Sequence, residues 1–215
     1  MIDLRDTLAL LSEDRPIFHS EADFQHALAW LIHRRNPDAH IRLEYRLSRP
    51  EREYLDLWVK DDACGLAIEL KYPTRGLSME HTGEQFLLLN HGAQDLTRYD
   101  FVKDICRVER WVHTRQGATG YAILLTNDSS YWTTPARTDT IDAAFRIHES
   151  VQLSGTRTWG PQTSAGTMKG RESALELRGS FEMSWHDYSL VGANPNGGRF
   201  RYLLVRVEPD ALSHR

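Results

Sequence analysis

Three charged residues stand inside two stretches that otherwise have the composition of buried strands. The segment LDLWVKDDACGLAIELKY carries Asp56 in its first apolar run, and Glu69 and Lys71 in its second. Alternate residues of a strand share a face, so one register places all three charges on the same side of two neighbouring strands. The opposite face is then the core face and consists of Leu55, Leu57, Ile68 and Leu70.

The chemistry that such a cluster could perform is metal-assisted attack on a phosphate. Two carboxylates held close together repel each other and lose hydration, and a divalent cation offsets both costs. Carboxylate oxygens favour Mg²⁺ or Mn²⁺ over zinc, and Mg²⁺ takes one or two of them, with water and substrate phosphate completing its shell. A nearby lysine can orient or deprotonate the attacking water and stabilise the developing charge. Asp56 and Glu69 are therefore candidate metal ligands, and Lys71 is a candidate catalytic residue.

A helix before these strands could supply a fourth member of the cluster. In the stretch HSEADFQHALAWLIHRRNP, Ser20 is a candidate N-cap and Pro37 ends the pattern. Glu21 lies on the same side as Gln25 and Leu28 by its helical spacing, which indicates that it points toward the protein. The alternative is an ordinary acid in the first turn, favoured by the helix dipole.

The elements that must position these residues follow a simple order. The stretches HIRLEYRL, REYLDLWVK and GLAIELKY predict three consecutive strands that begin as an antiparallel meander. AQDLTRYDFVKDICRVERWVHTRQG then predicts a long helix, and YAILLTND a buried strand. A strand, a crossover helix and a second apolar strand predict a parallel pair. The order is therefore α-β-β-β-α-β over residues 17–127.

This arrangement resembles the PD-(D/E)XK nuclease superfamily, the fold of many restriction endonucleases. The resemblance rests on the pattern D-x12-E-L-K formed by Asp56, Glu69 and Lys71, on the helical acid Glu21, and on the element order. Leu55 stands where the signature proline would be. The resemblance does not extend to residues 128–215.

The resemblance implies cleavage of phosphodiester bonds with Mg²⁺ (or Mn²⁺), with DNA as the expected substrate. It implies that Asp56 and Glu69 hold the metal, that Lys71 serves the nucleophilic water, and that Glu21 supports the site. Gln94 is a counterpart of a glutamine found in the following helix of some subfamilies, although its spacing to Tyr99 is not the usual one. Cleavage of both strands of a duplex would favour a homodimer.

Basic residues near the cluster are candidates for substrate binding. Arg75 follows the second strand of the cluster and is a candidate phosphate contact, together with Gln94. The long segment after that strand, residues 74–92, is expected to be functional rather than filler, with TRGLSMEHTG as a loop and EQFLLL as a short strand or hairpin arm. The helix carries a basic line that we interpret as a solvated, partly ion-paired face, with Asp100 before Lys103 and Asp104 before Arg107; its members are Lys103, Arg107 and Arg110.

The predicted fold class is α/β, with a restriction-endonuclease-like αβββαβ core and a C-terminal α+β extension. The prediction for residues 1–215 is a single domain, in which a core at 17–127 precedes an extension of helix and strands at 128–215 that packs on it. Within the extension we expect a helix at 137–150, a mobile loop at 154–170, strands at 173–179, 180–190 and 199–209, and a turn at 193–198.

Composition sets outer limits on the function. The net charge of −4 argues against indiscriminate coating of nucleic acid but not against a local basic surface. The sequence contains no apolar run of membrane-spanning length, and its N-terminus lacks the basic region of a signal peptide. Its two cysteines, Cys64 and Cys106, fit reduced structural thiols. We therefore expect a cytoplasmic protein without membrane contact.

Three alternatives stay open at this stage. The charges of Asp56, Glu69 and Lys71 could form a cross-strand salt bridge on a solvated sheet face. The chain could be a binding or interaction module that kept a nuclease fold without catalysis. It could also be an Mg²⁺-dependent enzyme that acts on RNA or on a nucleotide.

Overall fold

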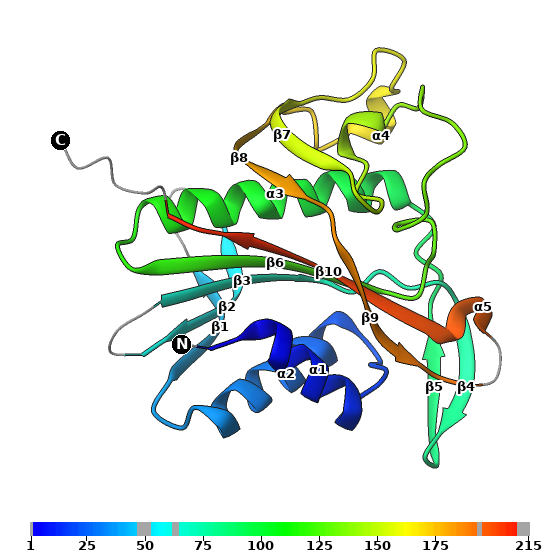
Figure 1. Ribbon diagram of the computed structural model, residues 1–215. Coiled ribbons are helices and arrows are strands. Elements are labelled where there is room, and N and C mark those ends of the chain that lie inside the picture. The colour runs from blue at the N-terminus through cyan, green and yellow to red at the C-terminus, as the bar shows by residue number, and fades with distance from the viewer. Residues whose placement is uncertain (1, 47–52, 62–64, 193–194, 210–215) are drawn as a thin grey trace.

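A mixed sheet of six strands runs through the protein in the order β1-β2-β3-β6-β10-β9 (Figure 1). The computed structural model describes residues 2–46, 53–61, 65–192 and 195–209. The strands of this sheet are His40–Arg46 (β1), Tyr54–Lys60 (β2), Gly65–Lys71 (β3), Ala118–Thr126 (β6), Trp185–Leu190 (β9) and Arg199–Val207 (β10). Helices flank it on both faces, so the fold is α/β.

The pairing of the first strands follows the predicted pattern. β1, β2 and β3 form an antiparallel meander, and β3 pairs with β6 in parallel. The crossover between β3 and β6 contains α3 (Gln94–His113), the crossover helix predicted for a parallel pair. β3 and β6 are buried on both faces because helices cover each side of the sheet there.

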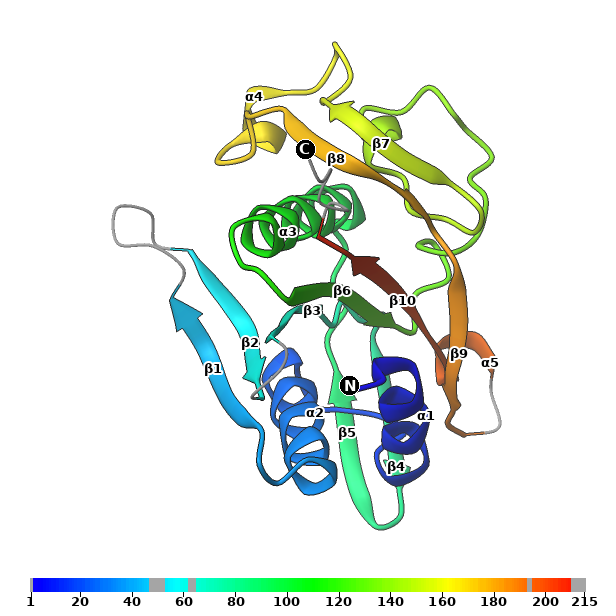
Figure 2. The ribbon, with the colours of Figure 1, turned by 60° about the vertical axis from the view of Figure 1, so that its left-hand side comes forward.

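Two helices cover one face of the sheet and α3 covers the other (Figure 2). α1 (Leu4–Asp14) begins at Asp3, whose carboxylate accepts hydrogen bonds from the backbone N–H groups of Arg5 and Asp6. No helix was predicted from the sequence for this segment. α2 (Glu21–Arg35) begins at the predicted N-cap, where the Ser20 hydroxyl accepts from the Asp23 N–H.

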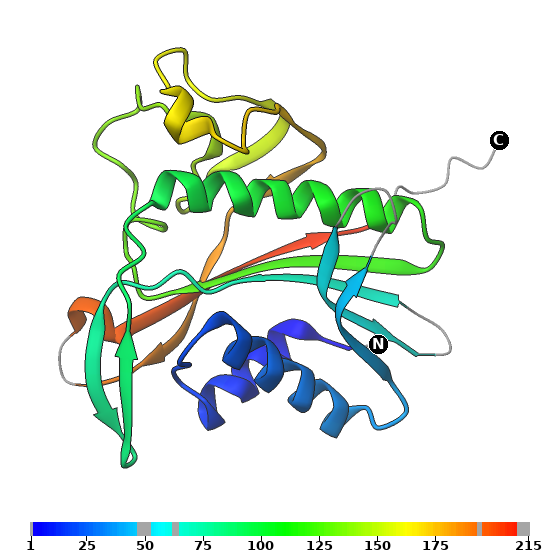
Figure 3. The same ribbon diagram turned by 180° about the vertical axis from the view of Figure 1, so that it is seen from behind.

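A two-stranded hairpin leaves the sheet after β3 and extends beyond its end (Figure 3). It consists of β4 (Leu77–His81) and β5 (Glu84–Leu88), which pair antiparallel around a tight turn at Thr82 and Gly83. The prediction of a hairpin arm at EQFLLL is confirmed, and the prediction of a loop over TRGLSMEHTG is wrong. β4 alternates half-buried and exposed positions, which is the pattern of a strand with one covered face.

The C-terminal part both extends the sheet and covers α3. β9 and β10 are the last two strands of the main sheet, whereas β7 (Gln152–Arg157) and β8 (Leu175–Glu182) form a separate pair over α3 (Figure 3). The Glu109 carboxylate of α3 fixes this pair by accepting the Gly179 N–H at 2.7 Å. α4 (Ala165–Met168) and α5 (Pro195–Gly198) are single turns, and the expected loop at 154–170 is thus partly ordered as β7 and α4.

The helix predicted over residues 137–150 is wrong. Only a 3-10 turn, η1 (Ala143–Phe145), forms there. Asp142 pairs with Arg98 of α3 at 2.8 Å and with Arg146 at 3.1 Å. Phe145 and Ile147 are both fully buried, and this two-residue period is that of an extended chain. Tertiary burial and ion pairing therefore override the local helical pattern.

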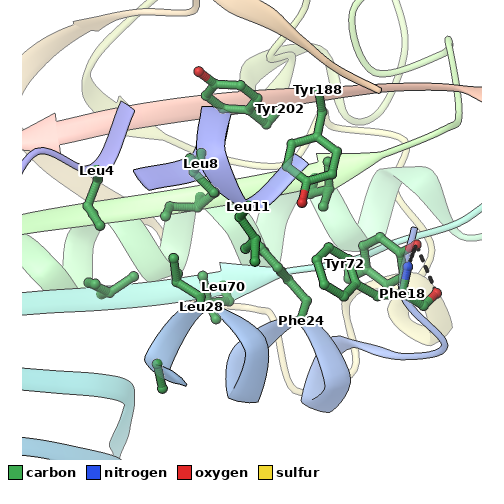
Figure 4. Close-up of a cluster of buried hydrophobic side chains, with 14 of the residues drawn as sticks. Leu4, Leu8, Leu11, Phe18, Phe24, Leu28, Leu70, Tyr72, Tyr188 and Tyr202 are labelled. Atoms are coloured by element: carbon green, nitrogen blue, oxygen red, sulfur yellow. Dashed lines mark hydrogen bonds between the residues drawn. The ribbon is translucent and has the colours of Figure 1, made fainter. Parts of the chain in front are cut away.

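The core on the α1–α2 side fixes the end of β3. Figure 4 shows Leu4, Leu8 and Leu11 of α1 facing Leu70 and other members of the same cluster. Tyr72 is the residue that follows β3. Its hydroxyl donates to Phe18 O at 3.0 Å and accepts from Phe18 N at 3.2 Å. The segment before α2 is thereby joined to the strand end that carries the charged residues.

Of the two cysteines, the structure describes only Cys106. Cys106 is a buried free thiol, and burial raises its pKa to about 12. Cys64 and the beginning of the predicted turn at 193–198 lie outside the described residues. None of the described helices combines the length and apolar character that a membrane span requires.

The close approach of α3 to β6 gives a test of this packing. A Cβ at Gly120 would overlap Val108 Cγ1 and stand 2.8 Å from Val112 Cγ2, so we expect Gly120→Ala to lower the free energy of unfolding by about 1–3 kcal/mol. Urea denaturation measures this change. Gly166→Ala, at an exposed position where a Cβ would meet Ser164 Oγ at an ordinary contact distance of 3.8 Å, is the matched control and should change stability by less than about 0.5 kcal/mol. Equal stability of the two variants would contradict the packing described.

Candidate active site

Asp56 stands where β2 and β3 stop pairing. Their ladder runs from Lys60–Gly65 to Leu57–Ile68, and among the described residues it ends there although both strands continue. Asp56 Oδ2 instead accepts the Leu70 N–H at 2.6 Å. A side-chain oxygen thus takes the place of a ladder carbonyl. This hydrogen bond holds the Asp56 carboxylate between the two strands.

The backbone is irregular on the other side of Asp56 as well. The β1–β2 pairs pass from Leu43–Leu57 to Tyr45–Leu55, and Glu44 between them has a left-handed φ of 49°. Gln25 of α2 stabilises this point, since its side-chain amide donates to Glu44 Oε1 at 2.9 Å and to Asp56 O at 2.8 Å.

This irregularity corrects one part of the predicted core face. Leu55 does not pack with Leu57, because it belongs to a separate cluster with Ala67 and Trp111 on the α3 side. Strict alternation along β2 would have placed Leu55 and Leu57 on one face. Leu57, Ile68 and Leu70 do form the core face on the α1–α2 side, as predicted.

Glu69 and Lys71 project from β3 toward α3 and meet oppositely charged side chains there. Glu69 Oε1 lies 2.7 Å from Arg107 Nη1, and Lys71 Nζ lies 2.8 Å from Asp104 Oδ2. Asp104 Oδ1 lies 3.1 Å from Arg107 Nη1, which links the two pairs. The charges are therefore not a cross-strand salt bridge on a solvated face: Glu69 is only 2% exposed and Asp104 only 3%.

Glu21 reaches the same strand end from α2. Its Oε2 accepts the Tyr72 N–H at 2.8 Å, directly after Lys71 in the chain. The Phe18–Tyr72 hydrogen bonds visible in Figure 4 hold the two segments in this position. The charge of Glu21 also acts on both Asp56 and Lys71. The structure therefore brings all four predicted residues to one end of β3.

Burial and mutual repulsion perturb the acids of the cluster. Desolvation raises the pKa of Asp56 to about 6, although the hydrogen bond from Leu70 N–H and the charge of Lys71 lower it. Desolvation and the charges of Asp104 and Asp56 hold the pKa of Glu69 well above its usual range, against the lowering effect of Arg107. Desolvation by itself would lower the pKa of Lys71, but Asp104 and Glu21 outweigh it and raise the pKa, so Lys71 stays charged.

The donor set fits a hard divalent cation with few protein ligands. Within the described ranges, no three His, Cys, Asp or Glu side chains gather closely enough to form a metal cluster. Mg²⁺, however, uses one or two carboxylates and keeps several waters. Asp56 and Glu69 provide two such carboxylates that act electrostatically on each other. When ionised, the acids Glu21, Asp56, Glu69 and Asp104 exceed the cations Lys71 and Arg107 by two charges, which one divalent cation balances.

A cleft of about 370 Å³ opens beside Lys71 and Glu21. Thr74, His91 and Thr97 line it, together with the backbone that follows β3. His91 Nδ1 accepts the Thr74 N–H at 3.0 Å, so the cleft wall is fixed by hydrogen bonds. Lys71 and Glu21 are the members of the charged cluster that line this cleft, whereas Asp56 and Glu69 are not among its lining residues.

The two predicted substrate-binding residues lie near the cleft but differ in availability. Arg75 is exposed, and its backbone is held on both sides by the Asn127 side-chain amide. No partner of its guanidinium is found in the part of the chain that the structure describes. The Gln94 side-chain amide is already engaged, because its Nε2 donates to Asp128 Oδ2 at 3.0 Å.

Sequence reasoning missed Asp104 and Arg107 as members of the site. The predicted Asp104–Arg107 ion pair is confirmed, but Arg107 faces β3 and is largely buried rather than solvated. Arg110 of the same line is exposed and pairs with Glu53, and Asp100 pairs with Arg171 instead of Lys103. One signal could have found Asp104, since it lies three residues after Phe101 and falls inside the apolar stripe of the helix.

Comparison with known proteins yields no relative of this chain. A scan against protein-family models, a search of curated proteins and a search of solved structures each found no match. Function is therefore inferred from the geometry and electrostatics of the cluster at the end of β3.

The raised pKa of Asp56 makes a prediction about stability. The folded state binds the Asp56 proton more tightly than the unfolded state does. Ionisation of Asp56 therefore lowers the free energy of unfolding as pH rises from about 4 through about 6. We therefore expect Asp56→Asn, which keeps an acceptor for Leu70 N–H, to gain about 1–3 kcal/mol over the parent protein at pH 7.5 without divalent cations. At pH 4.5 the gain should be much smaller. Urea denaturation at both pH values measures it, and a loss of stability at pH 7.5 would count against this description.

Proposed function

We propose that this protein is a Mg²⁺- or Mn²⁺-dependent nuclease that hydrolyses phosphodiester bonds of DNA. Asp56 and Glu69 would hold the metal, Lys71 would act on the attacking water, and Glu21 would support the site. One observation carries the proposal: two desolvated carboxylates and a charged lysine meet at the end of β3, beside a cleft. A cluster of this composition is costly for folding, and a divalent cation is the ligand that offsets its charge.

The fold supports the same proposal. α2, β1, β2, β3, α3 and β6 follow each other in the order of a PD-(D/E)XK core, with β3 and β6 parallel. The β4–β5 hairpin is inserted after the strand that carries Glu69 and Lys71. We propose that these elements form a restriction-endonuclease-like core and that residues 128–215 are an extension of it within a single domain.

The residues of the cluster have distinct tasks in this mechanism. Lys71, kept protonated by Asp104 and Glu21, would orient the attacking water and stabilise negative charge that develops on the phosphate. Asp56 is fixed by the Leu70 N–H, so the position of its other oxygen, Oδ1, is set before any ligand binds. The bound metal would polarise the phosphate and lower the pKa of the water.

Substrate would approach through the cleft beside Lys71. Arg75 lies just beyond the strand end and is exposed, so its guanidinium is available to a phosphate of the backbone. Gln94 would have to exchange its contact with Asp128 for a substrate contact. The described part of one chain contains one such cluster, and a homodimer is the simple way to cut both strands of a duplex.

A second candidate function is a nucleic-acid or protein interaction module without catalysis. The internal pairs Glu69–Arg107 and Lys71–Asp104 favour it, because they neutralise the two central residues without any metal. The net charge of −4 also favours it. A phosphodiesterase that acts on RNA or on a nucleotide would use the same cluster and is separated from a DNA nuclease only by substrate.

Cleavage assays test the proposed function. We expect cleavage of DNA with Mg²⁺ or Mn²⁺ and none with EDTA, and a loss of at least about 100-fold in rate for Lys71→Met and for Asp56→Asn. Lys169→Met, at an exposed position far along the chain, is the matched control and should cleave like the parent protein. RNA and dinucleotide substrates run in parallel identify the alternative substrates. Folded protein that cleaves none of these substrates and binds no divalent cation in calorimetry would falsify the proposal.

Proton release on metal binding is an independent consequence. Carboxylates must be ionised to hold a metal, and the pKa of Asp56 is raised to about 6. Binding of Mn²⁺ at pH 5.5 should therefore release protons, and the affinity should rise by up to about tenfold per released proton for each pH unit below this pKa. Calorimetry in two buffers of different ionisation enthalpy measures the release. An affinity that is constant from pH 5 to pH 8 would show that these acids are not the ligands.

A further inference from the structure

We infer that Arg107 is a reserve phosphate ligand, which neutralises Glu69 in the free protein and leaves it to contact the scissile phosphate when metal and DNA bind. This inference rests on the proposed nuclease function and adds a residue that the sequence pattern did not include. It also gives the Glu69–Arg107 pair a role in catalysis, whereas the alternative function takes this pair as a sign that the site is inactive.

The first step concerns competition for Glu69. Arg107 Nη1 lies 2.7 Å from Glu69 Oε1, and Glu69 is almost completely buried, so no solvent screens this carboxylate. A cation on the same oxygen would have to replace the guanidinium. A cation on the other oxygen would stand within a few Å of it and be repelled. In both cases Arg107 weakens metal binding as long as it stays on Glu69.

The second step concerns what keeps Arg107 near the site. Asp104 lies between the two cations, with Oδ1 at 3.1 Å from Arg107 Nη1 and Oδ2 at 2.8 Å from Lys71 Nζ. Asp104 belongs to α3, one turn before Arg107. If Glu69 is taken by a metal, Asp104 remains as a partner for Arg107 and limits how far the guanidinium can move. Arg107 therefore stays beside Lys71.

The third step concerns a vacant donor. Arg107 Nε is buried and has no hydrogen-bond partner in the described part of the chain. Buried donors normally find an acceptor. Among the described residues the Nε atoms of Arg146, Arg157 and Arg201 are also buried without one, so what distinguishes Arg107 is that its unused donor lies in the charged cluster with Glu69 and Asp104. A phosphate oxygen is the acceptor that fits, because the planar guanidinium can bind phosphate through two parallel N–H groups.

These steps predict that metal and DNA assist each other's binding. A metal that displaces Arg107 from Glu69 leaves a guanidinium without its acidic partner, and a phosphate then replaces that partner. Without DNA the displaced Arg107 keeps Asp104, which already serves Lys71, and the weaker influence of the Glu53 charge. By linkage, the phosphate increases metal affinity and the metal increases phosphate affinity by the same factor.

The distinguishing experiment measures Mn²⁺ affinity and DNA cleavage on the same variants. For Arg107→Gln at pH 8.5 we expect Mn²⁺ to bind about tenfold more tightly than to the parent protein in the absence of DNA. The same variant should cleave DNA about 100-fold more slowly at saturating Mn²⁺. Tighter Mn²⁺ binding together with slower DNA cleavage distinguishes this role of Arg107, because loss of a purely structural residue would weaken both. Arg107→Lys keeps the charge and should keep the parent Mn²⁺ affinity, with partial activity.

Arg110→Gln is the matched control, since exposed Arg110 lies one turn along α3 and pairs with half-buried Glu53 rather than with the cluster. It should leave both quantities unchanged, and circular dichroism and thermal denaturation verify the fold of every variant. Parent protein that binds Mn²⁺ and cleaves DNA, with no gain of affinity in folded Arg107→Gln, would overturn the inference and leave the proposed function intact. A gain of affinity with unchanged cleavage would also overturn it. If the parent protein neither binds Mn²⁺ nor cleaves DNA, both the inference about Arg107 and the proposed nuclease function are wrong.

Discussion

The hydrogen bond from Leu70 N–H to the Asp56 carboxylate connects the sheet to the candidate site. It uses a backbone donor that an antiparallel ladder would normally give to a carbonyl, and it stands where the pairing of β2 and β3 ends. Gln25 stabilises the opposite edge, because its side-chain amide donates to Glu44 Oε1 and to the Asp56 carbonyl. The position of Asp56 relative to β3 is thus determined by backbone contacts, and the cluster depends on it.

The buried charges around Asp56 make the folded state less stable than apolar residues would at the same positions. Glu69, Asp104 and Arg107 are buried or largely buried, and removal of one partner would leave an uncompensated charge. α3 is anchored on its far side by β8 and on its near side by the core of β6 and β10, so it can hold two charged residues against β3. A protein that needed only stability would gain from apolar residues at these positions. The cost therefore indicates a function for the cluster, and a nuclease is the function that we propose.

Local patterns in the sequence were sufficient to predict the elements around the site. The N-cap at Ser20, the antiparallel meander and the parallel β3–β6 pair all follow from short-range spacing and from the connection rule. Alternation along β3 correctly placed Glu69 and Lys71 on one side. It failed at Leu55, because the bulge-like conformation of Glu44 cannot be recognised from apolar spacing.

The features that sequence could not supply depend on long-range contacts. Arg107 looked like a solvated helix residue, and only the position of α3 over β3 turns it toward Glu69. The segment around Phe145 was predicted as a helix, but Asp142 binds Arg98 in α3 and the chain runs extended into the core. α1 was missed because its apolar stripe is short and gains most of its stability by packing on the sheet.

A crystal structure of the protein soaked in Mn²⁺, with anomalous scattering to locate the metal, tests the central claim most directly. The account predicts one Mn²⁺ ion contacting Asp56 and Glu69, with Lys71 still beside Asp104 and Arg107 no longer on Glu69 Oε1. An anomalous map without a peak between these carboxylates, with the Glu69–Arg107 pair intact at saturating Mn²⁺, would contradict it.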